Sequence, residues 1–166
     1  MKTLSAISEL PNVPAIYALY GGQNKGSYVA YVGSAKQLKI RIIQHLVRRD
    51  SSVTTGVQAV SLNPDFVTKV EWWEHTDFVD PFCLAAAELV AFDVLDPVLS
   101  SRGTTPNQAK HLCKDDDFNN KMHILIQGEP NGCLLIPTFQ GALERIVALE
   151  NRMVELEQRI IELEKN

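Results

Sequence analysis

One stretch decides the fold: residues 14–49 read PAIYALYGGQNKGSYVAYVGSAKQLKIRIIQHLVRR. It holds two runs rich in β-forming residues, at 14–21 and 28–33, and the GGQNKGS between them supplies the glycine and asparagine that turns need. These runs predict a β-hairpin. Apolar residues then recur at helical spacing over 35–49, which predicts a helix directly after the hairpin.

Farther along the chain, one more strand is followed by a long helix. The run FVTKVEWWEH at 66–75 interleaves β-branched and aromatic residues with charges, which predicts a strand. Asp80–Pro81 is a helix-start signal, and the alanine- and leucine-rich run at 82–96 predicts a helix that Pro97 ends. The polar stretch 97–107 predicts a loop.

The last part of the chain is expected to be mostly helical. Residues 107–126 favour one or two short helices, CLLI at 133–136 favours a short strand, and one long helix starts at Pro137. We therefore expect three parts: a first domain over 1–103, a helical or irregular connector over 104–137, and a terminal helix over 138–166.

The composition is that of a soluble globular protein. The 166 residues are 45% hydrophobic and 22% charged, with a net charge of −4, which excludes collagen-like, low-complexity and wholly disordered chains. The three cysteines are widely spaced and form no CxxC pair, so neither a disulfide framework nor a zinc ribbon is predicted. Without a signal peptide at 1–11 or an apolar run long enough for a membrane, we expect a cytoplasmic protein with no membrane partner.

The charge is unevenly distributed along the chain. Residues 1–50 carry seven basic and two acidic side chains, a net charge of +5, whereas residues 51–141 carry five basic and twelve acidic ones. A basic N-terminal third predicts a phosphate-binding surface, although the whole chain is acidic. The alternative is that these lysines and arginines merely solvate one face.

The terminal helix carries a heptad pattern. Apolar residues fill every a and d position over nearly four heptads, with arginine at g and mostly glutamate at e. Parallel pairing sets each arginine opposite a glutamate, as with Arg152 and Glu157, whereas antiparallel pairing sets like charges together. The pattern predicts a parallel homodimeric coiled coil whose seam includes Ile146, Leu149, Met153, Leu156, Ile160 and Leu163.

A helix docked on its own domain is the alternative to this coiled coil. Val147, Val154 and Ile161 lie at position b, beside the predicted seam. They widen the apolar stripe, as in an amphipathic helix that packs against a globular core.

Five residues with chemically useful side chains come in an order that the predicted elements can bring together. The hairpin can place Tyr17 and Tyr31 near each other across its two strands. Arg41 and His45 are four residues apart, on one face of the helix that follows. Glu88 lies in an alanine-rich helix among apolar neighbours, where a lone carboxylate needs a partner such as a metal ion.

The order of these residues resembles the signature of the GIY-YIG endonuclease superfamily. The matching elements, in chain order, are AIY (15–17), YVG (31–33), Leu38, Arg41, His45 and Glu88. The resemblance covers residues 14–100. It implies an α+β fold with a small three-stranded antiparallel sheet flanked by helices, to which this chain adds the long C-terminal coiled-coil helix. Two departures are Ala15, where the family usually has glycine, and Ser100, near the place where it commonly has asparagine.

The resemblance implies a divalent-metal-dependent DNA endonuclease, with Mg²⁺ or Mn²⁺ as cofactor and with 5′-phosphate and 3′-hydroxyl products. Tyr17 would orient or deprotonate the attacking water, and Tyr31 would hydrogen-bond water or phosphate. Arg41 would stabilise charge on the scissile phosphate, His45 would relay a proton or contact phosphate, and Glu88 would hold the metal. The residues expected to bind DNA are Lys36, Lys39, Arg48, Arg49, Ser100 and Arg102.

The sequence leaves two other functions open. A non-catalytic dimeric module that keeps this fold and binds nucleic acid is favoured by Ser100 and by the acidic middle of the chain. A role as an interaction protein is open as well, because the terminal helix could pair with a different chain.

Overall fold

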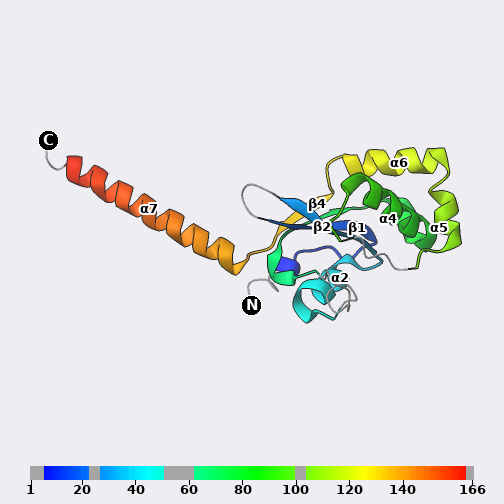
Figure 1. The fold of residues 1–166 in the computed structure, drawn as a ribbon, viewed down its shortest axis with the longest axis horizontal. Helices are drawn as coiled ribbons and strands as arrows, with labels where there is room; N and C mark the ends of the chain where they lie inside the picture. The colour runs from blue at the N-terminus through cyan, green and yellow to red at the C-terminus, as the bar shows by residue number, and fades with distance from the viewer. Residues whose placement is uncertain (1–5, 23–26, 51–61, 100–103, 164–166) are drawn as a thin grey trace. The chain divides into compact units, whose positions relative to one another are not determined.

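A four-stranded antiparallel sheet lies at the centre of the larger unit of the protein (Figure 1). The computed structural model describes residues 6–22, 27–50, 62–99 and 104–163. The chain divides into two compact units, Met1–Ile136 and Pro137–Asn166. The sheet has the order β2-β1-β3-β4, with strands β1 (Ala15–Gly21), β2 (Tyr28–Ala35), β3 (Val67–Trp73) and β4 (Gly132–Leu135). With helices around this sheet, the fold is α+β, as predicted.

The predicted hairpin is formed by β1 and β2. Ala15 lies opposite Ala35 and Tyr17 lies opposite Gly33 in the antiparallel ladder. The β2 strand runs to Ala35, two residues beyond the predicted end, which leaves the following helix to start later than expected. The β3 strand lies within the predicted range 66–75 and pairs with the other edge of β1.

The expected number of three strands is wrong, because β4 adds a fourth at the outer edge of β3. Gly132 lies opposite Trp72 in this pairing, and a Cβ atom on Gly132 would lie 2.0 Å from Cζ2 of the Trp72 ring. Only a glycine therefore lets the indole lie against the strand at this point. Residues 104–136 of the segment expected as a connector thus belong to the larger unit.

Helices cover both faces of the sheet. Successive residues of β1 point to opposite faces, so Tyr17 and Leu19 join one core cluster, whereas Ile16 and Ala18 join the other. The first cluster includes Leu38 of α2 (Leu38–Ile43) and is closed by that helix. The second cluster packs α4 (Pro81–Leu95) and α6 (Asp116–Gln127) against the opposite face.

The helix predicted over 35–49 is shorter and irregular. Only Leu38–Ile43 is α-helical, and Gln44–Arg48 continues as a π-helical turn. Arg49 ends it in the left-handed conformation, with a φ of 58°. Single π-helical turns often occur at functional sites, and this one carries His45.

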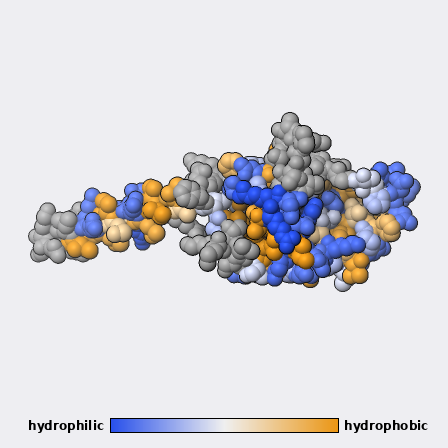
Figure 2. All heavy atoms as spheres, turned by 90° about the horizontal axis from the view of Figure 1, so that it is seen from below, coloured by the Kyte–Doolittle hydropathy of each residue, from blue (hydrophilic) through white to orange (hydrophobic). Residues whose placement is uncertain are grey.

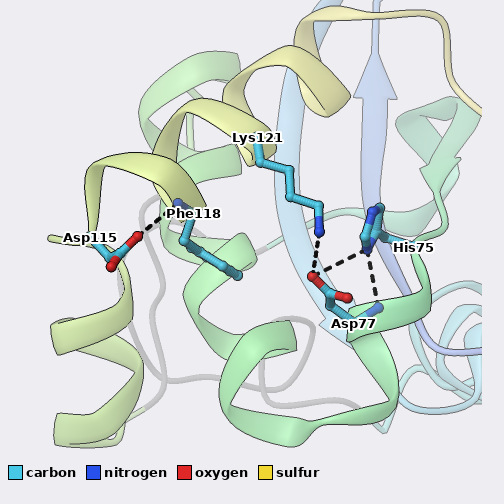
Figure 3. Close-up of polar contacts among 5 residues, drawn as sticks. All are labelled: His75, Asp77, Asp115, Phe118 and Lys121. Carbon is cyan, nitrogen blue, oxygen red and sulfur yellow. Dashed lines mark hydrogen bonds and ion pairs between the residues drawn. The ribbon is translucent and has the colours of Figure 1, made fainter.

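Two short helices follow α4, as predicted, and a carboxylate caps the second of them. They are α5 (Asn107–Leu112) and α6. The backbone N–H of Phe118 donates to the Asp115 carboxylate at 3.0 Å (Figure 3). Nζ of Lys121 lies 2.7 Å from Oδ2 of Asp77, in the 3₁₀ turn Thr76–Val79, which ties α6 to the segment before α4.

The smaller unit consists of helix α7 (Phe139–Leu163), 25 residues long, within the predicted range. Hydrophobic and hydrophilic surfaces lie side by side along it (Figure 2). Exposed apolar side chains include Leu149 and Met153, at 63% and 61% relative exposure. Within the described residues, no helix combines the length and the apolar composition that a membrane span needs.

The cap of α6 yields a stability prediction. Asp115→Ala removes the acceptor for the Phe118 N–H and should lower the free energy of unfolding by about 1 kcal/mol. Asp115→Asn keeps an acceptor oxygen and should stay close to wild type. Asp117→Ala, in the first turn of the same helix, is the control. Urea unfolding measures all three, and equal losses for Asp115→Ala and Asp115→Asn would contradict the cap.

Candidate active site

Three rings from separate elements meet beneath α2. The ring centroids of Tyr17 and Tyr31 are 6.1 Å apart, and His45 lies 5.7 Å from Tyr17 and 5.5 Å from Tyr31. The phenol oxygen of Tyr17 lies 2.6 Å from Nε2 of His45. β1, β2 and the π-helical turn thus bring together three residues that the sequence singled out.

Gly33 makes the approach of the two phenols possible. It faces Tyr17 across the ladder, and a Cβ atom there would lie 2.6 Å from the Tyr17 oxygen and 2.9 Å from Cε1 of Tyr31. Any other residue would push the rings apart. The glycine of the YVG tripeptide therefore has a steric role that the sequence pattern alone did not reveal.

Arg41 joins the ring cluster from the exposed side. Its side chain is partly buried, and Nη1 donates to Oε1 of Gln44 at 3.2 Å. Burial raises the pKa of Tyr17 well above its usual value and also raises the pKa of Tyr31. The positive charge of the guanidinium lowers both pKa values in turn. Burial is the larger effect, so both tyrosines stay protonated beside Arg41.

His45 is a neutral imidazole in this environment. Burial, followed by the positive charge of Arg41, lowers the pKa of His45 to about 3. At neutral pH its contact with Tyr17 is therefore a hydrogen bond between two uncharged groups. This bond satisfies two polar atoms that have no access to solvent.

Glu88 reaches the same site from α4, on the other side of β2. Its side chain is partly buried, and the hydroxyl of Ser34 donates to its Oε2 at 2.5 Å. The negative charge of Glu88 contributes to the raised pKa of both Tyr17 and Tyr31, so the carboxylate lies within electrostatic range of both phenols. β2 is an edge strand of the sheet, which is why helices on both faces can contribute to one site.

The five predicted residues differ in their access to solvent. Tyr17 and His45 are completely buried and Tyr31 keeps 5% of its surface exposed, whereas Arg41 and Glu88 are partly exposed. The implied role of Tyr17 in contacting the attacking water does not fit this burial. Arg41 and Glu88 are therefore the members of the candidate site that are most open to solvent, and Tyr31 keeps only a small exposed surface.

A divalent cation held by one carboxylate fits this arrangement. The described residues contain no group of three His, Cys, Asp or Glu side chains that could form an all-protein metal site. Mg²⁺ binds through one or two carboxylates together with water and substrate oxygens. Glu88, partly exposed and fixed by Ser34, is a suitable ligand of that kind.

The residues expected to bind DNA are only partly described. Lys36 and Arg48 are exposed and Lys39 is partly buried, all near Arg41 in the sequence. Nη2 of Arg49 lies 2.5 Å from Oδ1 of Asp65, and such an exposed ion pair contributes only about 0–1 kcal/mol. The remaining two expected residues, at positions 100 and 102 (Ser100 and Arg102), lie outside the described residues.

The buried imidazole yields a pH prediction. Between pH 6.5 and 4.5 the unfolded chain protonates His45 while the folded protein does not, because its folded pKa is about 3. The contribution of His45 to the free energy of unfolding is therefore largest above pH 6.5. It falls by about 2 kcal/mol between pH 6.5 and pH 4.5. Urea unfolding of wild type and His45→Gln across this range should show a shallower pH dependence for the variant. Parallel curves would contradict a neutral buried imidazole.

Comparisons with protein-family models, with curated proteins and with solved structures found no match for this chain. The GIY-YIG resemblance therefore rests on the order of residues in the sequence. The site itself rests on the contacts of Tyr17, Tyr31, Arg41, His45 and Glu88.

Proposed function

We propose that the protein is a divalent-metal-dependent DNA endonuclease that hydrolyses phosphodiester bonds to 5′-phosphate and 3′-hydroxyl ends. One observation carries this proposal. The guanidinium of Arg41 lies close enough to two buried phenols to lower the pKa of each, the carboxylate of Glu88 accepts a hydrogen bond from Ser34, and both charged side chains are partly exposed. The order of these residues also matches the resemblance noted in the sequence.

Arg41 supplies the contact to the scissile phosphate. Attack on a phosphodiester builds negative charge on the non-bridging oxygens, and a planar guanidinium fork matches their geometry. A guanidinium has five N–H donors, so the bond from Nη1 to Gln44 leaves donors for a phosphate. Because Gln44 restrains the guanidinium before substrate arrives, less reorganisation is needed during the reaction.

Glu88 is the residue that would hold the cation. A bound Mg²⁺ or Mn²⁺ supplies neutralisation of the charge that develops on the leaving 3′ oxygen. Tyr31, which keeps a small exposed surface, is the phenol that can hydrogen-bond phosphate or water. Tyr17 and His45 act as positioning residues, since both are completely buried.

The second candidate is a non-catalytic module that binds nucleic acid through the same guanidinium. The complete burial of Tyr17 and His45 favours it, because no buried group can take a proton from water directly. The exposed Lys36 and Arg48 would serve phosphate binding in either case. A protein that binds DNA but leaves it intact with Mg²⁺ present would decide for this candidate.

We further propose that two copies pair in parallel through α7. Five of its a and d side chains are about half or more exposed: Ile146, Leu149, Met153, Leu156 and Ile160. Parallel pairing buries these residues and sets Arg152 opposite Glu157 of the second copy, which antiparallel pairing does not. Each such exposed ion pair contributes about 0.2–1 kcal/mol, so the charges select the orientation and the apolar seam supplies most of the affinity.

The nuclease assignment is tested by cleavage of supercoiled plasmid with Mg²⁺. Arg41→Ala should lower the rate by about 10²- to 10³-fold, as expected for loss of a preorganised donor. The rate of Arg41→Lys should lie between those of wild type and Arg41→Ala, because lysine keeps the charge but loses the planar fork.

Glu88→Gln should cleave plasmid much more slowly than wild type, and a chelator should stop cleavage by the wild-type protein. Exposed Lys110→Ala, on α5, is the control. Wild-type nicking by Arg41→Ala or Glu88→Gln would refute the assignment.

The pairing of α7 is tested by light scattering of the purified protein. Leu156→Glu places a charge in the seam and should raise the dimer dissociation constant by about 10²-fold or more. Gln158→Glu, on the outer face of the same turn, should leave the dimer intact.

The parallel orientation is tested by exchanging one pair of charges. Arg152→Glu should weaken the dimer, and adding Glu157→Arg should restore it. A wild-type monomer would contradict pairing, and a double variant weaker than both single variants would contradict the parallel orientation.

A further inference from the structure

Ser34 links the hairpin to the acidic residue of the site. Its hydroxyl donates to Oε2 of Glu88 at 2.5 Å, across 54 residues of sequence. Ser34 lies opposite Ile16 in the ladder, on the face that α4 covers, whereas Gly33 lies opposite Tyr17 on the face that α2 covers. Gly33 and Ser34 are neighbours in β2 but face opposite sides of the sheet. Gly33 leaves room for the two phenols, and Ser34 bonds to Glu88.

A bond of this kind fixes the direction of a carboxylate. A hydroxyl that donates to an ionised oxygen at this distance forms a short, charge-assisted hydrogen bond. A glutamate on a helix otherwise samples several staggered rotamers. Ser34 is part of β2, so the position of its hydroxyl is set by the strand backbone. The hydrogen bond therefore restrains Oε2 of Glu88 relative to the sheet.

We propose that Ser34 is a positioning residue for cation binding, because it orients the Glu88 carboxylate toward the divalent metal. The inference rests on the proposed function, since it requires that Glu88 binds a metal. Hydrogen-bonding partners of metal ligands typically change metal affinity by about 10- to 100-fold when they are removed. A serine that only satisfied a partly buried carboxylate would change stability but leave the affinity of a correctly placed ligand unchanged.

Direct Mn²⁺ binding to the full-length protein tests the proposal. Electron paramagnetic resonance of free Mn²⁺ gives the affinity without any cleavage step. Ser34→Ala should weaken Mn²⁺ binding by about 10- to 100-fold, and Ser34→Thr, which keeps the hydroxyl, should restore most of the affinity. Ser27→Ala, an exposed serine just before β2, is the matched control and should bind as wild type does. Circular dichroism establishes that each variant is folded.

A cleavage titration provides the second readout. Ser34→Ala should raise the Mg²⁺ concentration for half-maximal rate by the same factor, while the rate at saturating Mg²⁺ stays within about threefold of wild type. Loss of rate at saturating Mg²⁺ with unchanged Mn²⁺ affinity would overturn the positioning role.

The outcomes separate this inference from the proposed function. Equal Mn²⁺ affinity of wild type and Ser34→Ala, with binding lost in Glu88→Gln, would overturn the role of Ser34 and leave the metal site in place. A wild-type protein that binds no Mn²⁺, or a Glu88→Gln variant that binds as tightly as wild type, would overturn the metal site and with it the inference.

Discussion

The close approach of two tyrosine rings over Gly33 is the constraint on which the candidate site depends. Without a side chain at position 33, Tyr17 and Tyr31 can both lie against β2, and His45 closes the cluster from the π-helical turn. Their polar atoms are removed from water, so they need partners within the protein. The bond from Tyr17 to His45 meets that need for Tyr17, and the charge of Arg41 acts on both phenols. The environment of Arg41 is thus a consequence of how the core packs.

The sequence predicted the individual strands and helices well, but it did not predict which distant strands pair. The hairpin followed from two β-forming runs around a glycine-rich turn, and α4 followed from Asp80–Pro81 and the alanine-rich run behind it. The run at 133–136 did suggest a strand. Its place beside β3 depends on contacts with a segment some sixty residues earlier, as the pairing of Gly132 with Trp72 shows. Periodicity within a short window carries no information about such a partner.

The members of the candidate site could be proposed from the sequence, but their burial could not. Tyr17, Tyr31, Arg41, His45 and Glu88 come in an order that pointed to one site, and they do lie around one strand edge. How deeply each is covered depends on the way α2 and α4 close over the two faces of β2.

Glu88 separates the two functional candidates on electrostatic grounds. A guanidinium supported by buried phenols suits phosphate binding with or without catalysis. A carboxylate within electrostatic range of the same cluster repels a bound phosphate, and this repulsion weakens a module that only binds nucleic acid. A divalent cation held by Glu88 would offset that repulsion and would supply charge neutralisation for the phosphate. A carboxylate within electrostatic range of the phenols that Arg41 also reaches therefore weakens simple phosphate binding and favours metal-assisted hydrolysis, which supports the nuclease proposal despite the burial of Tyr17.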